Sequence, residues 1–569
     1  MSLGRATMAP VVADLTSLSI QRSLKEEVIN NFSSPYGQEG NLQTRKLNMN
    51  IKDRNTEKRV QLLSLGEPTM KPTKVILLMG ATGTGKTTLI NNMVNFIYRV
   101  EFTDDFRLIL IDDKNASKCS QAESQTNMIS AYVFYNLQGM PFDYNYVLID
   151  TPGFGDTTGI EQDRLLMLQL NDFLKQNYNI DHVDSIGFVT PSSAVRLTHT
   201  QRYVYDGLSS MFGKDVKDNI YILATFADAR TPPIRDGLKA ANIKYSGLYK
   251  FNNSALYASN KGNGSESESE SDDEENSYLI NKTFWEMGYN SMNNFFKKLG
   301  KTLPVSLTLT KEVLEERNKL QITAIGLQNQ IHIGLSVLAN LNKERSMLAR
   351  LGDDMQGCAN YKEEIQVPRI REINLQKGEH VTNCLTCNMT CHYPCYIPED
   401  KNKSHCRAMK DMYCQACPQK CFWNIHRNNT FRYETSWHTE ERTVQELLDR
   451  YNNAQQGMLD KQALVKAIEE DINKLSELLI DKIKTAQKCV DRLEEIALKP
   501  NPLATHEYID LLIESEKNEK RHNFQDRIAM LQKLKEEVAV LQGVRSNVSS
   551  KSGEALLQFF QKLMAKLNS

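Results

Sequence analysis

The sequence predicts an α/β domain, built on a mostly parallel sheet with helices on both faces, followed by long helices that carry a small metal-stabilised module. Three observations lead to this prediction. Short apolar runs alternate with helical patterns between Lys74 and about residue 300, which is typical of βαβ units. Beyond Pro304, apolar residues recur every three or four positions, as in long or coiled helices. Eight of the 11 cysteines lie between Cys384 and Cys421, and such clustering favours metal ligands.

Length and composition narrow the class of protein. A chain of 569 residues is too long for one hydrophobic core. A net charge of −1 gives no bulk attraction to nucleic acid, and no apolar run approaches the ~20 residues of a membrane span. The first residues lack an export signal, and Ser2 stands where myristoylation needs glycine. We therefore expect a soluble, cytoplasmic protein with no transmembrane segment and no nucleic-acid partner, for which peripheral membrane contact stays open.

The N-terminal half divides into a leader and a folded domain. Residues 1–73 carry polar stretches with weak periodicity, which predicts a partly disordered leader. Residues 74–300 form the α/β domain, and an acidic, low-complexity run at 262–277 is expected to be a disordered insertion. The strands of the sheet are expected at Val75–Met79, Arg107–Ile111, Tyr146–Ile149, Ser185–Val189 and Ile220–Leu223.

The C-terminal half is predicted to be helical on both sides of the cysteine block. Residues 301–375 are predicted to be a helical coiled coil, residues 376–432 the cysteine-rich module, and residues 433–499 a long helix. Pro500 and Pro502 end this helix, and residues 503–569 form a further helical region. The helices flanking the module either pair within the chain or associate with a second copy, because heptads alone do not reveal the partner.

The segment GATGTGKTT matches the phosphate-binding pattern G-x-x-x-x-G-K-[ST]. It follows an apolar run, VILLM, and precedes a helical pattern, as the motif requires. Its glycines let successive backbone N–H groups face the phosphates of a nucleotide, and the helix N-terminus adds its positive end. Lys86 is expected to reach the β- and γ-phosphates, and Thr87 to bind Mg²⁺. The expected nucleotide contacts are Gly80, Thr82, Gly83, Thr84, Gly85, Lys86, Thr87 and Thr88.

A second apolar run, YVLI, ends in Asp150 and continues as TPGFGDT. An aspartate at the end of a central strand is placed to hold Mg²⁺, directly or through water. With Gly153 it forms D-x-x-G, in which the backbone N–H of the glycine could sense the γ-phosphate. A capped turn after a strand would explain the proline and glycine as well, but not their pairing with the phosphate motif.

DTPGFGDT resembles the septin signature and the matching loop of the immunity-associated GTPases and of the chloroplast outer-envelope preprotein receptors. Together these form the septin-like (paraseptin) branch of the P-loop GTPases, and the resemblance covers about residues 74–300. It implies a P-loop G domain that binds GTP and GDP with Mg²⁺ and often dimerises across the nucleotide. The switch threonine of this branch corresponds to Thr126, with Ser124 as the competing residue.

The resemblance also implies how guanine is read. Many GTP-binding proteins read guanine with the motif Asn-Lys-x-Asp, and members of this branch depart from that motif. At the corresponding place this chain has Thr225-Phe226-Ala227-Asp228, followed by Pro232-Pro233 and Gly237. Asp228 can accept N1–H and N2–H₂ of guanine in a charge-assisted pair, whereas adenine has no such donors. A turn or helix-cap role for Asp228 is the alternative. Asn253, or less directly Asn252, corresponds to the residue of the immunity-associated group that faces the base.

Hydrolysis of GTP is expected to be slow. Phe154 follows D-x-x-G, where a Ras-like protein has a glutamine that orients water. The water would instead be placed by Thr126 or Ser124, or the transition state would be stabilised in trans by Arg196 or Arg230 of a partner subunit.

The cysteine block repeats the pattern C-x-x-C-x-x-x-C. Four Cys or His ligands in a tetrahedron suit a structural Zn²⁺, so two sets of four predict two zinc ions. The ligands are Cys384, Cys387, Cys391 and Cys395, then Cys414, Cys417, Cys421 and His426. Their pairing is open, because the halves could be cross-braced, and disulfides are the alternative. Cys406 and His392 remain outside the two sets.

The sequence thus predicts a guanine-nucleotide-binding GTPase switch. Its dimerisation or assembly, through the G domain and the coiled coils, would be coupled to a zinc-braced helical scaffold. The alternative is a non-catalytic nucleotide-binding scaffold that acts through its coiled coils and zinc module, and a P-loop ATPase comes third. Other protein partners are not identified by the sequence.

Overall fold

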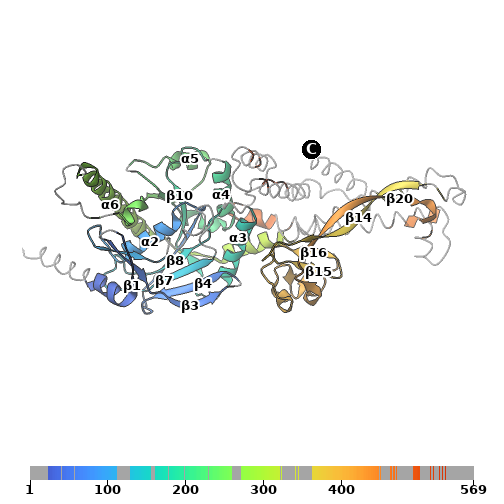
Figure 1. Cartoon of the computed structure of the whole chain (residues 1–569), viewed down its shortest axis with the longest axis horizontal. Helices are drawn as coiled ribbons and strands as arrows, with labels where there is room; N and C mark the ends of the chain where they lie inside the picture. The colour runs from blue at the N-terminus through green and yellow to red at the C-terminus, as the bar shows by residue number, and fades with distance from the viewer. Residues whose placement is uncertain are drawn as a thin grey trace, which may run out of the picture. The chain divides into compact units, whose positions relative to one another are not determined.

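The structure is a computed structural model that describes residues 23–39, 42–111, 128–154, 160–260, 271–320, 362–446 and 491–499, apart from a few positions within these ranges, and scattered residues elsewhere. The chain divides into two compact units (Figure 1). The first runs to Leu314 and includes Ile496–Leu503, and the second holds Glu315–Glu495. No helix in the described part of the chain is both long and apolar enough to span a membrane.

The first unit is built on an eight-stranded mixed sheet. Its strands lie in the order β12-β11-β10-β5-β8-β7-β4-β3. Neighbours from β12 to β8 are parallel, β7 is antiparallel to β8 and parallel to β4, and β3 is antiparallel to β4. In sheet order their bounds are Gly247–Lys250, Ile220–Thr225, Ser185–Pro191, Thr73–Gly80, Asn145–Asp150, Ile129–Phe134, Val60–Leu65 and Asn50–Asn55.

Helices cover both faces of this sheet. Successive strand residues point to opposite faces, and in β10 Val189 joins the core of α2 and α6 while Phe188 packs against Tyr205 of α4. On the first face, Phe96 of α2 contacts Phe296 of α6 at 5.1 Å between ring centroids. The α-helices are α2 (Lys86–Ile97), α3 (Ile160–Lys175), α4 (His199–Ser210), α5 (Ile234–Ala240) and α6 (Ser271–Lys301). The expected α/β fold is therefore found.

The first unit also contains two short helical turns, a two-stranded sheet and a three-stranded sheet. The turns are η3 (Lys214–Asn219) and η4 (Asn253–Leu256), and β9 (His182–Val183) pairs with β13 (Val305–Ser306). A three-stranded sheet holds β1 (Ser33–Glu39), β2 (Leu42–Leu47) and β6 (Phe106–Ile109), preceded by the π-helix η1 (Val28–Phe32). The strand expected at Arg107–Ile111 thus belongs to the three-stranded sheet and not to the eight-stranded one.

The prediction of a leader up to residue 73 is wrong for its described part, because residues 23–65 contain β1 to β4. Val60–Leu65 lies beside β7, residues 129–134, in parallel register. The apolar side chains of β4 are buried by partners almost 70 positions further on, so local periodicity could not reveal this strand. The domain therefore begins well before Lys74.

The acidic insertion is shorter than predicted. Residues 261–270 lie outside the described part, but α6 begins at Ser271 and takes in the rest of the run at 262–277.

In the second unit, two strands replace predicted helix. Strand β14 (Lys362–Asn374) pairs antiparallel with β20 (Phe431–Thr443) over 13 residues each, so the helical boundaries at 375 and 433 are wrong. The period-two pattern was present in the sequence. Aromatic and β-branched residues, which favour strands, occupy Phe431, Tyr433, Thr435, Trp437 and Thr439. The apolar stripes predicted to form coiled coils lie almost entirely outside the described residues.

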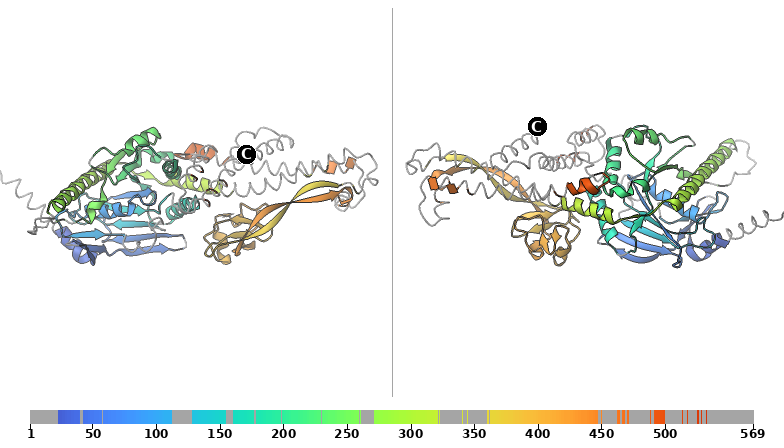
Figure 2. Two further views of the ribbon diagram at one scale, coloured as in Figure 1. Left: turned by 45° about the horizontal axis from the view of Figure 1, so that its top comes forward. Right: turned by 180° about the vertical axis from the view of Figure 1, so that it is seen from behind.

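The two strands form a twisted ribbon with the cysteine module at one end (Figure 2). Cross-strand ion pairs such as Lys362–Glu441 line the ribbon. The module contains little regular structure, and its buried core is made largely of cysteine side chains. Its elements are β15 (Thr382–Cys384), β16 (Met389–His392), η5 (Asp400–His405), β17 (Met409–Lys410), β18 (Tyr413–Cys414), η6 (Trp423–Ile425) and β19 (His426–Arg427).

Candidate nucleotide and metal sites

The loop between β5 and α2 has the curled backbone that a phosphate site needs. Gly83 and Gly85 have φ of 76° and 78°, in the left-handed region that only glycine adopts freely. A Cβ on Gly80 would lie 2.4 Å from the carbonyl oxygen of Val189, so this position also requires glycine. Thr225 Oγ1 donates to Thr84 O at 2.6 Å and ties the loop to β11.

Lys86 and Asp150 meet inside this loop. Lys86 Nζ lies 3.5 Å from Asp150 Oδ1, and their side chains are 7% and 1% exposed. They meet because β8 lies parallel to β5 with Asp150 opposite Leu78, while Lys86 begins α2. Thr87 follows in the first turn of α2. A buried carboxylate beside a helix N-terminus is a donor set that suits a hard divalent cation such as Mg²⁺.

The D-x-x-G segment touches the phosphate loop directly. Phe154 N donates to Gly80 O at 3.0 Å, and a Cβ on Gly153 would lie 2.3 Å from Thr82 Oγ1 and 2.9 Å from Thr82 Cα. The Phe154 ring is buried against Gly207 of α4. The backbone at Gly153 therefore faces the loop, whereas the next side chain points into the protein.

Asp228 lies in a turn after β11 and is exposed. Its Oδ1 accepts the backbone N–H of Arg230 at 2.9 Å, so the carboxylate is held by its own loop. Phe226 is 60% exposed and has φ of 51°, an uncommon conformation for an aromatic residue that often marks a functional site. Its ring lies 3.5 Å from where a Cβ on Gly85 would stand, which puts Phe226 beside the phosphate loop.

The two asparagines of the next loop have different surroundings. Asn252 Nδ2 donates to Ala227 O at 3.1 Å, next to Asp228. Asn253 is buried, and its Oδ1 accepts from Asn92 of α2 at 3.2 Å. Asn252 is thus the residue that contacts the Asp228 loop, although the sequence pointed first to Asn253.

The residues proposed to assist hydrolysis are less defined. Arg196 and Arg230 are both exposed, as an in-trans role requires. Thr126 and Ser124 lie outside the described residues.

Among the described residues of the second unit, ligand atoms gather in three groups, each with all its atoms within 4.8 Å of one another. Two groups share Cys417, and the third stands apart. The groups are Cys384, Cys387, Cys417 and Cys421; then Cys391, Cys414, Cys417 and His426; then His392, Cys395 and Cys406. The two halves are therefore cross-braced, and the assignment of Cys395 to the first set is wrong, because its loop carries it to His392 and Cys406.

The spacing within the groups fits zinc. Cys387 Sγ and Cys421 Sγ are 3.7 Å apart, and Zn–S bonds of about 2.3 Å in a tetrahedron require about 3.8 Å. All eight described cysteines are free thiols, and this separation far exceeds a disulfide bond of ~2.05 Å. The disulfide alternative is thus not the arrangement found.

His426 is oriented as a ligand. Its Nδ1 lies 3.2 Å from Phe422 O, the backbone contact that commonly orients a metal-bound histidine. Nε2 is buried without a hydrogen-bond partner among the described residues. Burial alone would lower the pKa of His426, but the nearby thiols of Cys384, Cys414 and Cys417 raise it to about 12. Without a metal, the pocket therefore favours a positive charge on this ring.

The third group has its own surroundings. A hydrogen bond with Cys406 lowers the pKa of the Cys395 thiol to about 3, whereas burial raises the pKa of Cys406. Sequence reasoning left His392 and Cys406 unassigned, because neither fits the C-x-x-C repeat. Their position next to the repeat was the signal that could have found them.

No protein-family model and no curated protein matches the chain. Solved structures of GTP-binding proteins resemble it at low identity. Toc33 from Arabidopsis thaliana in complex with GDP and Mg²⁺ is 13% identical, with 39% of this chain and 85% of Toc33 covered and a TM-score of 0.23. Elongation factor SelB from Methanococcus maripaludis with the GTP analogue GppNHp is 14% identical, covering 33% and 32% of the chains at a TM-score of 0.19.

A protein from an oligomerised bacterial dynamin pair is 10% identical, with 87% of this chain and 79% of that chain covered and a TM-score of 0.22. Identities and TM-scores of this size establish no family, so the function has to be inferred from the residues of the chain.

Proposed function

We propose that the first unit is a guanine-nucleotide switch that binds GTP and GDP with Mg²⁺ and hydrolyses GTP slowly. The observation that carries this proposal is the pair of Lys86 and Asp150, 3.5 Å apart in a glycine loop whose backbone is left-handed at Gly83 and Gly85. A buried lysine and aspartate at that point supply one cation for the phosphates and one anion for a metal ion, as phosphoryl transfer requires.

The phosphates would lie along Gly80–Thr88. Backbone N–H groups of the loop and the first turn of α2 would donate to their oxygens. Thr87 and Asp150 would hold Mg²⁺, which neutralises charge on the phosphates. Lys86, now paired with Asp150, would turn to the β- and γ-phosphates.

Guanine would be read by Asp228. The turn at Arg230 occupies one lone pair of Oδ1, and a carboxylate has about four acceptor sites, so both oxygens remain able to accept N1–H and N2–H₂. The exposed ring of Phe226, beside Gly85, offers an apolar surface for the base. Asn252 supports this site by its bond to Ala227 O.

Gly153 would sense the γ-phosphate through its backbone N–H, because it already contacts Thr82 of the loop. Phe154 is apolar and buried against α4, so the side chain at position 154 cannot orient water. Hydrolysis would therefore depend on Thr126 or Ser124, or on Arg196 or Arg230 of a second copy, which couples turnover to dimerisation. The same burial favours the competing proposal, a nucleotide-binding scaffold without turnover.

The second unit would be braced by two structural Zn²⁺ ions. Seven residues fill eight ligand positions if the thiolate of Cys417, common to both groups, bridges the ions. Four protein ligands at each ion leave no open position for catalysis. The nucleotide state of the first unit would then be coupled to this scaffold.

The nucleotide proposal is tested by the base that the protein selects. Nucleotide released from the purified full chain is separated by chromatography, and guanine nucleotide is expected; adenine nucleotide alone would refute the proposal. D228N is expected to lose GDP affinity by about tenfold to a hundredfold and to gain affinity for xanthosine diphosphate. Asp236→Asn is the matched control, since Asp236 is an exposed aspartate of α5. Unchanged guanine preference in D228N would contradict the assigned role.

Turnover separates the switch from the scaffold. Phosphate release is measured at rising protein concentration. A rate per chain that increases with concentration supports in-trans hydrolysis, and no release at any concentration favours the non-catalytic scaffold.

A further inference from the structure

The group His392, Cys395 and Cys406 lies outside the two groups that share Cys417. It has the features of a metal site. The three side chains come from the end of β16, the loop after it and the residue after η5. They are only 9%, 4% and 2% exposed. Two thiols and an imidazole buried together are soft ligand atoms of the kind that bind zinc.

The distances match a tetrahedral ion. Cys395 Sγ and Cys406 Sγ are 3.9 Å apart, and Cys406 Sγ lies 3.4 Å from His392 Nδ1. Bonds of about 2.3 Å to sulfur and about 2.0 Å to nitrogen at tetrahedral angles require about 3.8 Å and about 3.5 Å for these two edges. Both measured edges therefore have the length expected in a zinc tetrahedron, and all three ligand atoms lie within 4.8 Å of one another.

This group is separate from the two groups that share Cys417. Cys391 joins Cys414, Cys417 and His426, whereas its neighbour His392 joins Cys395 and Cys406, and the two groups have no ligand in common.

The surroundings stabilise thiolate ligands. Thr382 Oγ1 lies 3.2 Å from both Cys395 Sγ and Cys406 Sγ. Lys403, which is fully buried, donates to Val381 O at 2.7 Å and to Ile397 O at 2.6 Å, and its Nζ lies 3.8 Å from Cys395 Sγ. Such outer contacts orient metal ligands and spread their charge.

We propose that His392 Nδ1, Cys395 Sγ and Cys406 Sγ hold a third Zn²⁺, with a water molecule as the fourth ligand. Soft thiolates and imidazole select zinc over Mg²⁺ or Ca²⁺. Two thiolates neutralise the ion, so it can remain in a buried site. This site does not depend on the nucleotide or on the other two ions.

Metal content of the full chain tests the proposal. The purified protein is expected to hold three zinc ions per chain by elemental mass spectrometry, and His392→Ala and C406S to hold two. His405→Ala is the matched control, because His405 is the exposed neighbour of Cys406 and three ions should remain. His392→Cys should also retain three, since it restores a ligand, which a purely structural role for the histidine would not explain.

Three outcomes would overturn the proposal. The first is a content of two zinc ions in the wild-type chain that does not change in C406S. The second is a Cys395–Cys406 disulfide, detected by mass spectrometry of the alkylated protein. The third is loss of the third ion in His405→Ala as well. Nucleotide binding by each variant shows that the first unit remains folded. If C421A loses no zinc while C406S does, the proposal of two zinc ions bridged by Cys417 is wrong and the third site still stands.

Discussion

In the loop between β5 and α2, single atoms decide whether the chain can take up the observed conformation. Gly153 and Thr82 lie so close that there is no room for a methyl group on the glycine. Gly80 is likewise confined by Val189 O of the neighbouring strand. The phosphate site therefore depends on the main chain of three segments in contact, β5, β8 and β10.

Gly153→Ala tests whether the close approach of Gly153 to Thr82 is needed for nucleotide binding. The new methyl would stand 2.9 Å from Thr82 Cα, a backbone atom that can only move with the loop, so affinity for a GTP analogue should fall by about tenfold or more. Titration with a fluorescent nucleotide measures the change.

The matched control is Gly288→Ala in α6, where the nearest atom to a new Cβ is Asn92 Nδ2 at 3.8 Å. Alanine is about 0.5–1 kcal/mol better than glycine within a helix, so this variant should bind as the wild type does. Equal affinities in both variants would show that Gly153 does not approach the phosphate loop.

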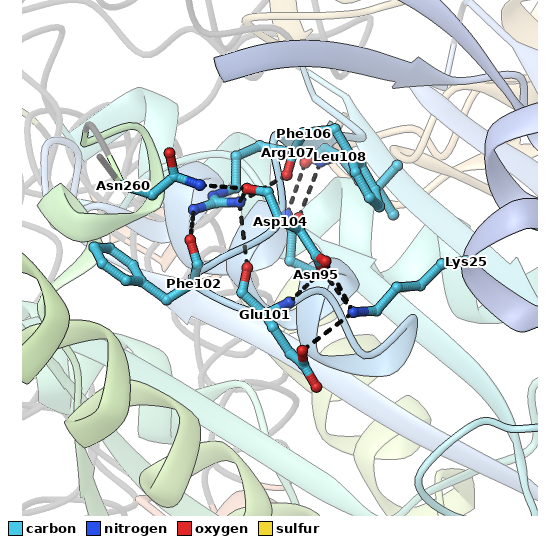
Figure 3. A network of polar contacts seen from close by, with 9 residues as sticks. All are labelled: Lys25, Asn95, Glu101, Phe102, Asp104, Phe106, Arg107, Leu108 and Asn260. Carbon is cyan, nitrogen blue, oxygen red and sulfur yellow. Dashed lines mark hydrogen bonds and ion pairs between the residues drawn. The ribbon is translucent and has the colours of Figure 1, made fainter. Parts of the chain in front are cut away.

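At the scale of elements, one buried arginine joins the three-stranded sheet to η4 and α6. Arg107 of β6 donates to five backbone carbonyls, among them Leu256 O at 3.0 Å. Figure 3 shows Arg107 with Asp104, whose carbonyl oxygen accepts at 2.8 Å, and with Phe102. The Arg107 guanidinium lies 4.5 Å from the Trp285 ring of α6. Burial lowers the pKa of Arg107 to about 10, so the side chain remains charged at neutral pH.

Arg107→Met should destabilise the first unit by roughly 2–4 kcal/mol, because it leaves buried carbonyls without donors. Denaturant unfolding followed by tryptophan fluorescence measures the loss. R235M, in an exposed position of α5, should change the free energy of unfolding by less than about 0.5 kcal/mol. A similar small change in Arg107→Met would mean that the network does not support the fold.

At the scale of the whole molecule, the two units are held together internally by different forces. The first has a large core of aliphatic and aromatic side chains. The core of the cysteine module is made mainly of cysteines, and a two-stranded ribbon is marginally stable by itself. Metal binding would thus supply folding free energy to the second unit.

Removal of zinc should therefore act on one unit. A zinc-selective chelator at neutral pH, with Mg²⁺ kept in excess, is expected to make residues 376–432 sensitive to protease while GDP affinity changes by less than about twofold. Limited proteolysis with mass spectrometry locates the cleavage, and re-addition of Zn²⁺ should restore resistance. Resistance that persists after complete metal removal would show that the module folds without metal.

Contiguous motifs were predictable from the sequence because their geometry is local. Gly83, Gly85 and Lys86 follow one another in a loop whose form needs only their own backbone conformations. The alternation of Phe431, Tyr433 and Trp437 is equally local and is typical of a strand, although the helical pattern that follows it in the sequence favours helix across the same residues. Other contacts in the structure have no local signal.

The sequence by itself determined the residue types of both sites: a glycine loop with lysine, a strand-end aspartate, and thiolates with histidine. Tertiary structure alone decided which of them meet. Cys417 is shared by two groups, Cys395 joins His392 and Cys406, and Asn252 contacts the Asp228 loop in place of Asn253. It also placed β4 beside β7. The physical reason is that these contacts join segments far apart in the chain, where side-chain direction and strand pairing, and not spacing, bring atoms together.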